Sequence, residues 1–241
     1  MKIVKNVRKV EKKTTIYEII TIFAFCNKNA MVELEIFKNI PLESSVLLNV
    51  MSNYRFPRNK VSALEKRGLI IRLKKGLYVV SEKISRTPVS RELVANHLYG
   101  LSYLSLETAL SFYGMIPERV IAIRSMTTKR AKTFETPFGN FDYTTVSTNY
   151  FNIGIRQEIV ENQYAFLIAT PTKAVCDMIV ATPNLRLQSV KAMQNYLVED
   201  LRIDSDVLKK LDKDIVKQCV EVGMKKNELI QLLKFLFELK K

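Results

Sequence analysis

The sequence predicts an α+β protein, with an N-terminal winged helix-turn-helix followed by a mixed α/β domain that ends in helices. The first observation is a helix-sized segment that starts at a proline, ends at a glycine and precedes two apolar runs joined by Lys74-Lys75-Gly76. The second is a succession of extended patterns over residues 115–170, and the third is helical periodicity over residues 171–241. The expected domains are residues 1–86 and residues 87–241.

The first segments of the chain are apolar at regular spacing. Residues 14–26 place isoleucines and a phenylalanine on one face, with Thr14 or Thr15 available as the N-cap, so we expect a helix there. Residues 31–38 alternate apolar and polar side chains, which fits a short strand and a helix equally well. Residues 42–51 are largely apolar and predict a buried helix.

The next helix is delimited by its end residues. Pro57 has the fixed φ that suits a first helical turn, and Gly68 is a suitable C-cap. Val61 and Leu64 are expected on the inward face, with Ala63 as a third candidate. The exposed face is expected to hold Arg58, Asn59, Lys60, Ser62, Lys66 and Arg67. Strands are then expected at residues 70–73 and 77–80.

A polar, proline-containing segment at residues 85–90 resembles a linker, and the charge density falls there. The elements expected beyond it are two helices in 91–114 separated by Gly100-Leu101-Ser102, strands at 116–124 and 126–132, a turn at 138–141 between extended segments, a buried strand at 164–169, and a helix at 170–180 that starts at Pro171. The final helical segment is apolar around much of its circumference, so it either packs on its own domain or offers a partner surface.

The positive charge is concentrated in the first third of the chain. The formal net charge is +14; residues 1–86 hold 18 Lys and Arg against 7 Glu, and the remainder holds 20 against 17 acidic residues. Such an asymmetry indicates one module that meets a polyanion and another with a different task. A basic, solvated surface without a polyanion partner is the alternative.

The exposed face of the 57–67 helix has the residue types of a DNA-reading helix. Short donors and acceptors near the N-terminus can reach base edges, while longer cations contact phosphates. The candidate DNA-binding residues are Arg58, Asn59, Lys60, Ser62, Lys66 and Arg67 on the helix, with Arg72, Lys74 and Lys75 on the wing. A solvated helix face is the simpler alternative, and winged helices also contact proteins. Tyr54, Phe56 and Tyr78 could stack on single-stranded bases, although core packing accounts for them as well.

Catalytic and metal-binding motifs are absent from the sequence. It contains no GxSxG, Walker or GxGxxG motif, and His97 is the sole histidine. Cys26, Cys176 and Cys219 form no CxxC pair, which predicts reduced, buried thiols and no zinc site. We therefore expect a binding protein without catalytic residues, metal or cofactor.

The apolar run near the N-terminus does not predict a membrane protein. Glu18 interrupts the run, which is too short to span a bilayer, and no signal-peptide cleavage site follows it. We therefore expect a cytoplasmic protein that does not associate with membranes.

Four stretches of the chain together resemble the AbiEi-type antitoxin and transcriptional-regulator family. They are FPRNKVSALEKRGLIIRLKKGLYVV, ELVANHLYGLSYLSLETALSFYGMIPE, TPFGNFDYTTVS and YAFLIATPTKAVCDMI, spread over roughly residues 50–180, and SYLSLETALSFYGMIP is the most specific. The resemblance implies an N-terminal winged helix on operator DNA and a C-terminal antitoxin domain opposing a nucleotidyltransferase toxin. It also implies a type IV system, in which the two proteins need not form a stable complex.

The expected mechanism is negative autoregulation, with two copies or a homodimer binding inverted repeats upstream of their own operon. Two alternatives remain open. The chain could be a protein-interaction module that neutralises the toxin directly, or an RNA-binding protein that shields the toxin's substrate.

Overall fold

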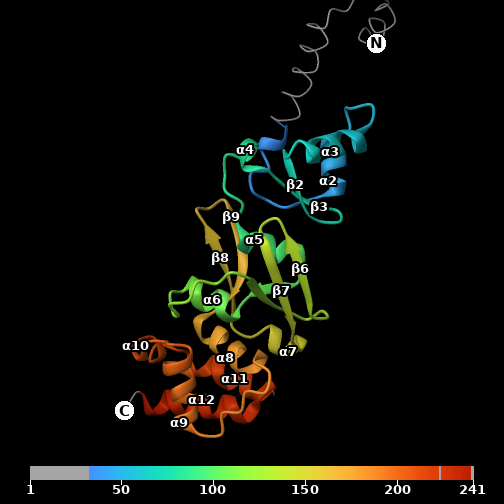
Figure 1. The fold of residues 1–241 in the computed structure, drawn as a ribbon. Helices are drawn as coiled ribbons and strands as arrows, with labels where there is room; N and C mark the ends of the chain where they lie inside the picture. The colour runs from blue at the N-terminus through green and yellow to red at the C-terminus, as the bar shows by residue number, and fades with distance from the viewer. Residues whose placement is uncertain (1–32, 223, 240–241) are drawn as a thin grey trace, which may run out of the picture. The chain divides into compact units, whose positions relative to one another are not determined.

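The computed structural model describes residues 33–222 and 224–239 of the chain (Figure 1). The described residues form helices and two β-sheets, which confirms the α+β class. The chain divides into two compact units. The first runs to Ile71 and continues from Gly76 to Val89, and the second comprises Arg72–Lys75 and the chain from Ser90 onward. The helix expected at residues 14–26, and Cys26 within it, lie outside the described residues.

The first unit is built on a small three-stranded sheet. Its elements are β1 (Leu42–Glu43), α2 (Ser44–Val50), α3 (Pro57–Lys66), β2 (Ile70–Lys74), β3 (Leu77–Val80) and α4 (Glu82–Ser85). The strand order is β1-β3-β2, with Leu42 opposite Tyr78 in the β1–β3 register. The last three residues of β2 are grouped with the second unit. The turn to β3 is completed by Gly76 at φ +84°, a conformation that favours glycine.

Helix α3 begins and ends where its sequence predicts. Pro57 occupies its first turn, and Gly68 follows at φ +64°, accepting the left-handed conformation of a helix C-terminus. The Leu69 amide donates to the Leu64 carbonyl at 3.0 Å, which satisfies a carbonyl that the helix leaves unpaired. Val61 and Leu64 are buried as predicted, but Ala63 is exposed, so that candidate for the inward face is wrong.

Helix α2 forms within the predicted segment, but its burial was overestimated. Leu47 is the residue of this helix that is fully buried, while Val46 is 39% exposed. The core of the unit gathers Leu47, Leu64 and Ile70 from three successive elements. Leu48 and Val50 of this helix are partly buried against the same core, so Val46 is its one strongly exposed apolar side chain.

The second unit contains a six-stranded mixed sheet and a group of helices. Its strands are β4 (Ser102–Leu104), β5 (Ile123–Thr127), β6 (Lys132–Thr136), β7 (Gly139–Thr145), β8 (Ile155–Val160) and β9 (Tyr164–Ala169), in the order β6-β7-β5-β4-β9-β8. Its helices are α5 (Arg91–Leu98), α6 (Leu106–Phe112), α7 (Thr148–Phe151), α8 (Pro171–Ala181), α9 (Val190–Asn195), the π-helix η2 (Tyr196–Asp200), α10 (Ser205–Leu208), α11 (Lys213–Val222) and α12 (Lys226–Glu238). Figure 1 shows α8, α9, α11 and α12 gathered at one end of the sheet.

Several predicted elements of this unit are confirmed. Strand β9 covers Tyr164–Ala169, and α8 begins at Pro171 with Thr170 as its N-cap, whose hydroxyl accepts from the Lys173 amide. Phe141 and Tyr143 alternate on the buried face of β7. Helix α12 buries Leu229, Leu232, Phe235 and Leu236, so most of its apolar face packs on its own unit.

Other boundaries in the second unit were predicted wrongly. Ser102, expected at the break between two helices, and residues 103–104, expected at the start of the second helix, form strand β4 near the centre of the sheet. The strands expected at 116–124 and 126–132 are instead β5 and β6, shifted along the chain. The apolar run before β5 misled the assignment, since Ile121 is 84% exposed and belongs to no strand. Strand β8 was not predicted at all.

Replacing Gly154 with alanine is expected to lower the free energy of unfolding by at least about 2 kcal/mol. Gly154 has φ +59°, and an added Cβ would lie 3.0 Å from Lys173 Cβ and 3.1 Å from Ile215 Cγ2. The substitution therefore combines left-handed strain with a steric conflict against α8 and α11. Urea denaturation followed by circular dichroism measures the change.

Gly114→Ala is the matched control. Gly114 has φ +64°, but nothing lies within 4 Å of an added Cβ, so only the conformational strain applies. An equal loss of stability in both variants would show that the crowding around Gly154 has no energetic consequence.

Candidate nucleic-acid interface

The outward face of α3 carries the residue types expected of a DNA-reading helix. Arg58, Asn59, Ser62, Lys66 and Arg67 are exposed, as predicted. This follows from the helical period. Val61 and Leu64 are buried on one face of α3, so Asn59, Ser62 and Lys66 lie on the opposite face. No acidic side chain lies in the first turn of α3, so the partial positive charge of this helix end is left uncompensated there.

Lys60 differs from its neighbours on α3. It is half-buried, and its ammonium lies 4.5 Å from the centroid of the Tyr54 ring. A cation held over a ring is directed by that contact. Among the predicted residues of α3, Asn59 and Ser62 are therefore the short polar groups presented outward near the helix start.

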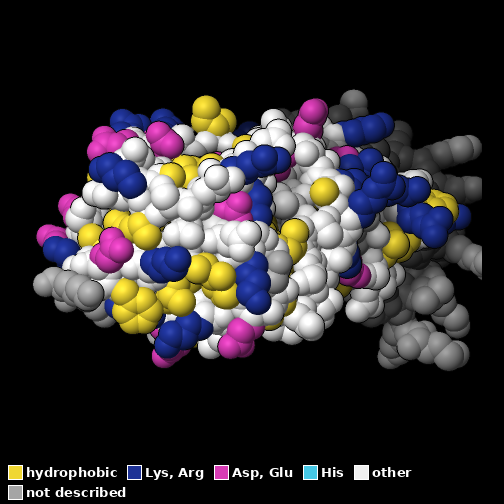
Figure 2. All heavy atoms as spheres, turned by 90° about the horizontal axis from the view of Figure 1, so that it is seen from below, with side chains coloured by type: hydrophobic (Ala, Val, Ile, Leu, Met, Phe, Trp, Pro, Cys, Tyr) yellow, Lys and Arg dark blue, Asp and Glu magenta, His cyan; other side chains and the backbone are white. Residues whose placement is uncertain are grey.

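The segment from Arg55 to Lys75 is strongly cationic. It holds eight Lys and Arg residues, with Glu65 as its one acidic residue. Figure 2 shows Lys and Arg side chains gathered closely over one part of the visible face and mixed with Asp and Glu over the rest. Such a concentration attracts phosphates by charge before any specific contact forms.

The three predicted hairpin cations are grouped with the second unit, apart from the six on α3. Within that unit, Lys74 Nζ donates to the Leu98 carbonyl at 2.5 Å and lies 5.8 Å from the Phe134 ring centroid. Arg72 and Lys75 are exposed. Lys74 is thus half-buried and bonded to the Leu98 carbonyl, whereas Arg72 and Lys75 are exposed hairpin cations.

The three aromatic residues considered for base stacking have different environments. Tyr54 packs against the core of the first unit, and Tyr78 is only 6% exposed. Phe56 is 59% exposed, with the Arg55 guanidinium 5.2 Å from its ring centroid. Core packing accounts for two of the three rings, and Phe56 is the one presented at the surface.

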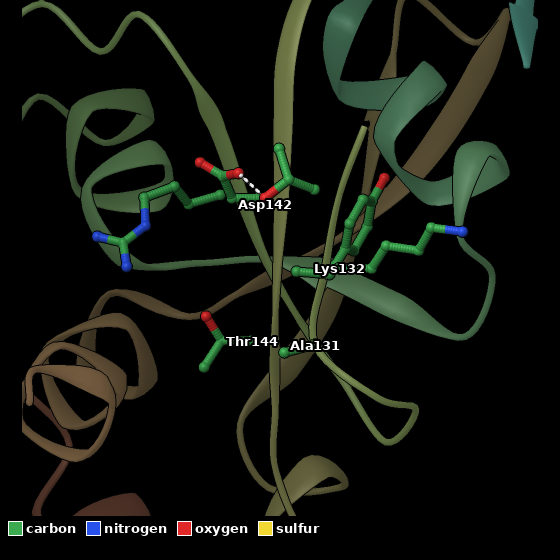
Figure 3. A pocket seen from close by; sticks show the side chains of 7 residues that line it. Ala131, Lys132, Asp142 and Thr144 are labelled. Atoms are coloured by element: carbon green, nitrogen blue, oxygen red, sulfur yellow. Dashed lines mark hydrogen bonds between the residues drawn. The ribbon is translucent and has the colours of Figure 1, made fainter. Parts of the chain in front are cut away.

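A hollow of about 620 Å³ lies beside β6 and β7 in the second unit (Figure 3). Its polar groups are already engaged with each other or with neighbours. Thr133 Oγ1 donates to Asp142 Oδ1 at 2.7 Å, the dashed line in Figure 3, and Arg124 donates to both carboxylate oxygens of Glu107 at 2.7 Å. Lys132 also lines the hollow, but its ammonium lies 4.6 Å from the Phe134 ring centroid.

A buried charge pair, missed by sequence reasoning, lies in the core of the second unit. Lys173 and Asp177 are both fully buried on α8, with Lys173 Nζ 3.3 Å from Asp177 Oδ1. Asp177 Oδ2 accepts from Tyr103 at 3.0 Å and from Ser105 at 2.6 Å, and Lys173 Nζ donates to the Tyr150 carbonyl at 2.8 Å. The signal in the sequence was the i, i+4 spacing of Lys and Asp within an otherwise apolar helix.

Two tyrosines and two cysteines surround this pair. The pKa of both Tyr103 and Tyr150 is raised well above that of an ordinary phenol, mainly by burial and then by the nearby Asp177 charge. Both hydroxyls therefore stay neutral. Cys176 and Cys219 are buried free thiols, which confirms the prediction for these two residues. Because every member is buried, we assign the cluster to holding α8 against the sheet.

His97 is exposed in the last turn of α5. Across the part of the chain that the structure describes, no three His, Cys, Asp or Glu side chains lie close enough to hold a metal ion.

Within residues 33–222 and 224–239, no helix is both long enough and apolar enough to cross a membrane.

Comparison with known proteins gives matches among solved structures but none by sequence. No family model matches the chain, and no curated protein matches it. The crystal structure of the RV2827C protein from Mycobacterium tuberculosis is similar at a TM-score of 0.48 and 10% sequence identity, covering 88% of this chain and 80% of that chain. A likeness at this level identifies neither a family nor a function.

Proposed function

We propose that this protein is a DNA-binding antitoxin of a type IV toxin-antitoxin system that represses its own operon, with α3 as its recognition helix. The observation that supports DNA binding best is the outward face of α3, where Asn59 and Ser62 lie among exposed cations. Side chains of this kind at the start of a helix can contact base edges, while Lys and Arg contact phosphates.

The arrangement of the first unit supports a winged helix. The chain order β1-α2-α3-β2-β3 and the sheet order β1-β3-β2 are those expected of a winged helix-turn-helix, which supports this part of the proposal. In helix-turn-helix proteins the second helix enters the major groove, which corresponds to α3 here. The β2–β3 hairpin would then be the wing, with Arg72 and Lys75 as its phosphate contacts.

The antitoxin role rests on the resemblance of residues 50–180 to the AbiEi-type family. On this proposal the second unit counteracts a nucleotidyltransferase toxin and performs no catalysis, and no cofactor is required. The protein acts in the cytoplasm, where its operator and its toxin are located.

The test is a footprint and binding titration of the purified protein on the DNA upstream of its own gene. Random duplex of equal length and RNA of equal length serve as controls. We expect protection of an inverted repeat, with affinity about a hundredfold or more above that for random duplex. Equal, weak binding to all three polyanions would overturn the proposal, and co-purification with a nucleotidyltransferase would then favour direct neutralisation.

Removing the exposed hairpin cations is expected to weaken DNA binding irrespective of sequence. In Arg72→Ala plus Lys75→Ala, two phosphate contacts are lost, so the slope of log K against log salt should become shallower by about 1.8. Affinity for operator and for random duplex should fall by the same factor. Fluorescence anisotropy titrations at four salt concentrations measure both quantities.

Lys191→Ala plus Lys210→Ala removes the same charge from exposed positions in the helical part of the second unit. This control should bind with an unchanged salt slope. A slope that changes equally in both double variants would show that net charge, and not the hairpin, determines the affinity.

A further inference from the structure

Two aromatic rings and three cations form a patch on the second unit, away from the hollow's engaged polar groups. Its members, called here the aromatic–basic patch, are Tyr99, Lys129, Arg130, Lys132 and Phe134. The Tyr99 and Phe134 ring centroids are 5.5 Å apart. Lys129 Nζ lies 5.3 Å from the Tyr99 centroid and Lys132 Nζ lies 4.6 Å from the Phe134 centroid. The patch thus places a cation beside each ring.

Three elements bring these residues together. Tyr99 follows α5, Lys129 and Arg130 lie between β5 and β6, and Phe134 lies within β6. The Tyr99 hydroxyl donates to the Arg130 carbonyl at 3.2 Å, which ties the loop to the end of α5. Because β6 is at the end of the strand order, its outer side is not covered by another strand of this sheet, and both rings remain partly exposed.

The positive charge of the patch is not neutralised within the protein. Lys129, Arg130 and Lys132 are exposed, and within the described residues none of them forms an ion pair. The acids nearest along the strands are Glu135, which follows Phe134 on β6, and Asp142, which lies on β7 opposite Thr133. Side chains alternate along a strand, so both acids point to the opposite face of the sheet.

We infer that the aromatic–basic patch binds single-stranded nucleic acid, with bases stacked on Tyr99 and Phe134 and phosphates held by Lys129, Arg130 and Lys132. Cations interleaved with exposed aromatic rings are the two components of single-strand recognition. This inference concerns a different surface from α3 and does not depend on operator binding.

The Tyr99 and Phe134 rings favour a single strand of nucleic acid over other anionic partners. A base stacked on an aromatic side chain is held more strongly than an ammonium over an exposed ring, so a base can displace Lys129 or Lys132. The displaced ammonium remains at the edge of the ring, where it can meet the adjoining phosphate. A duplex keeps its bases stacked internally, and an acidic peptide supplies carboxylates but no base, so neither uses the rings.

The test measures binding of a fluorescein-labelled 12-nucleotide uridine strand to the full-length protein by anisotropy at several salt concentrations. In Phe134→Leu, which retains apolar volume, affinity should fall about fivefold or more with the salt slope unchanged. Phe134→Tyr retains a stacking surface and should bind like the parent protein. In Lys129→Gln plus Lys132→Gln, the slope should become shallower by about 1.4, because two phosphate contacts are lost.

Lys191→Gln plus Lys210→Gln is the charge-matched control and should bind like the parent protein. Thermal unfolding of each variant establishes that the fold is retained, and the salt slope of Lys129→Gln plus Lys132→Gln carries the test if Phe134→Leu is unstable. Failure of the parent protein to bind the strand would overturn the inference. An equal loss of duplex binding in Phe134→Leu, or no loss of strand binding in it, would also overturn the inference.

Discussion

Replacing Lys173 with methionine is expected to lower the free energy of unfolding by about 3–5 kcal/mol, the usual cost of leaving one member of a buried ion pair uncompensated. Lys173 and Asp177 are both fully buried, and Asp177 Oδ1 has no hydrogen-bond partner among the described residues, so the ammonium 3.3 Å away compensates its charge. Methionine fills similar volume but carries no charge. Urea denaturation monitored by circular dichroism gives the change.

Two further variants separate charge from packing. Lys217→Met breaks the Lys217–Asp214 pair on α11, which is exposed, and should leave the free energy of unfolding nearly unchanged. Adding Asp177→Asn to Lys173→Met removes the unpaired carboxylate while keeping an acceptor for Tyr103 and Ser105, and should recover part of the loss. If the buried and exposed lysine variants were equally stable, the Lys173–Asp177 pair would have no special role in the core.

Replacing Asn59 with alanine is expected to reduce the preference for operator over random duplex by about tenfold to a hundredfold, the discrimination supplied by a side-chain amide paired with a base edge. Asn59 is exposed in the first turn of α3, and alanine favours the helix, so the fold should be retained. Parallel titrations on the footprinted operator and on random duplex measure the ratio of the two affinities.

Lys66→Ala is the matched control for this result. Lys66 is exposed in the last turn of the same helix and is expected to contact phosphates only. Its loss should weaken both duplexes by the same factor and leave their ratio unchanged. The assignment of α3 as the reading helix would fail if Asn59→Ala behaved in the same way.

Elements with clear end signals were the ones that sequence reasoning located. Pro57 and Gly68 delimit α3, and Thr170 with Pro171 starts α8, because capping and fixed φ act on neighbouring residues. Strand β4 lacks such a signal. Leu106, the first residue of α6, has φ +56°, an unusual conformation for leucine, and this change of direction after the strand leaves no trace in the hydrophobic spacing.

The candidate sites also differ in how far the sequence predicts them. The exposure of Arg58, Asn59 and Ser62 could be predicted, since it depends on the period of one helix. The burial of Lys173 could not be predicted in the same way: the i, i+4 spacing pairs it with Asp177, but the Tyr150 carbonyl that also accepts from it lies on α7, which only the folded chain brings near. The contact between the Tyr99 and Phe134 rings likewise joins separate elements and has no local pattern.

The centre of the six-stranded sheet has a consequence for how the chain folds. Strands β6 and β7, and likewise β8 and β9, are joined by short turns and can pair early, since hairpins form in about 1–10 μs. The parallel pairing of β4 with β9 joins Leu104 to Ile168, across most of the sheet-forming segment. During synthesis, β4 must therefore remain an open strand edge until β9 leaves the ribosome. This interval is when the nascent chain is most exposed to aggregation, and when a chaperone would act on it.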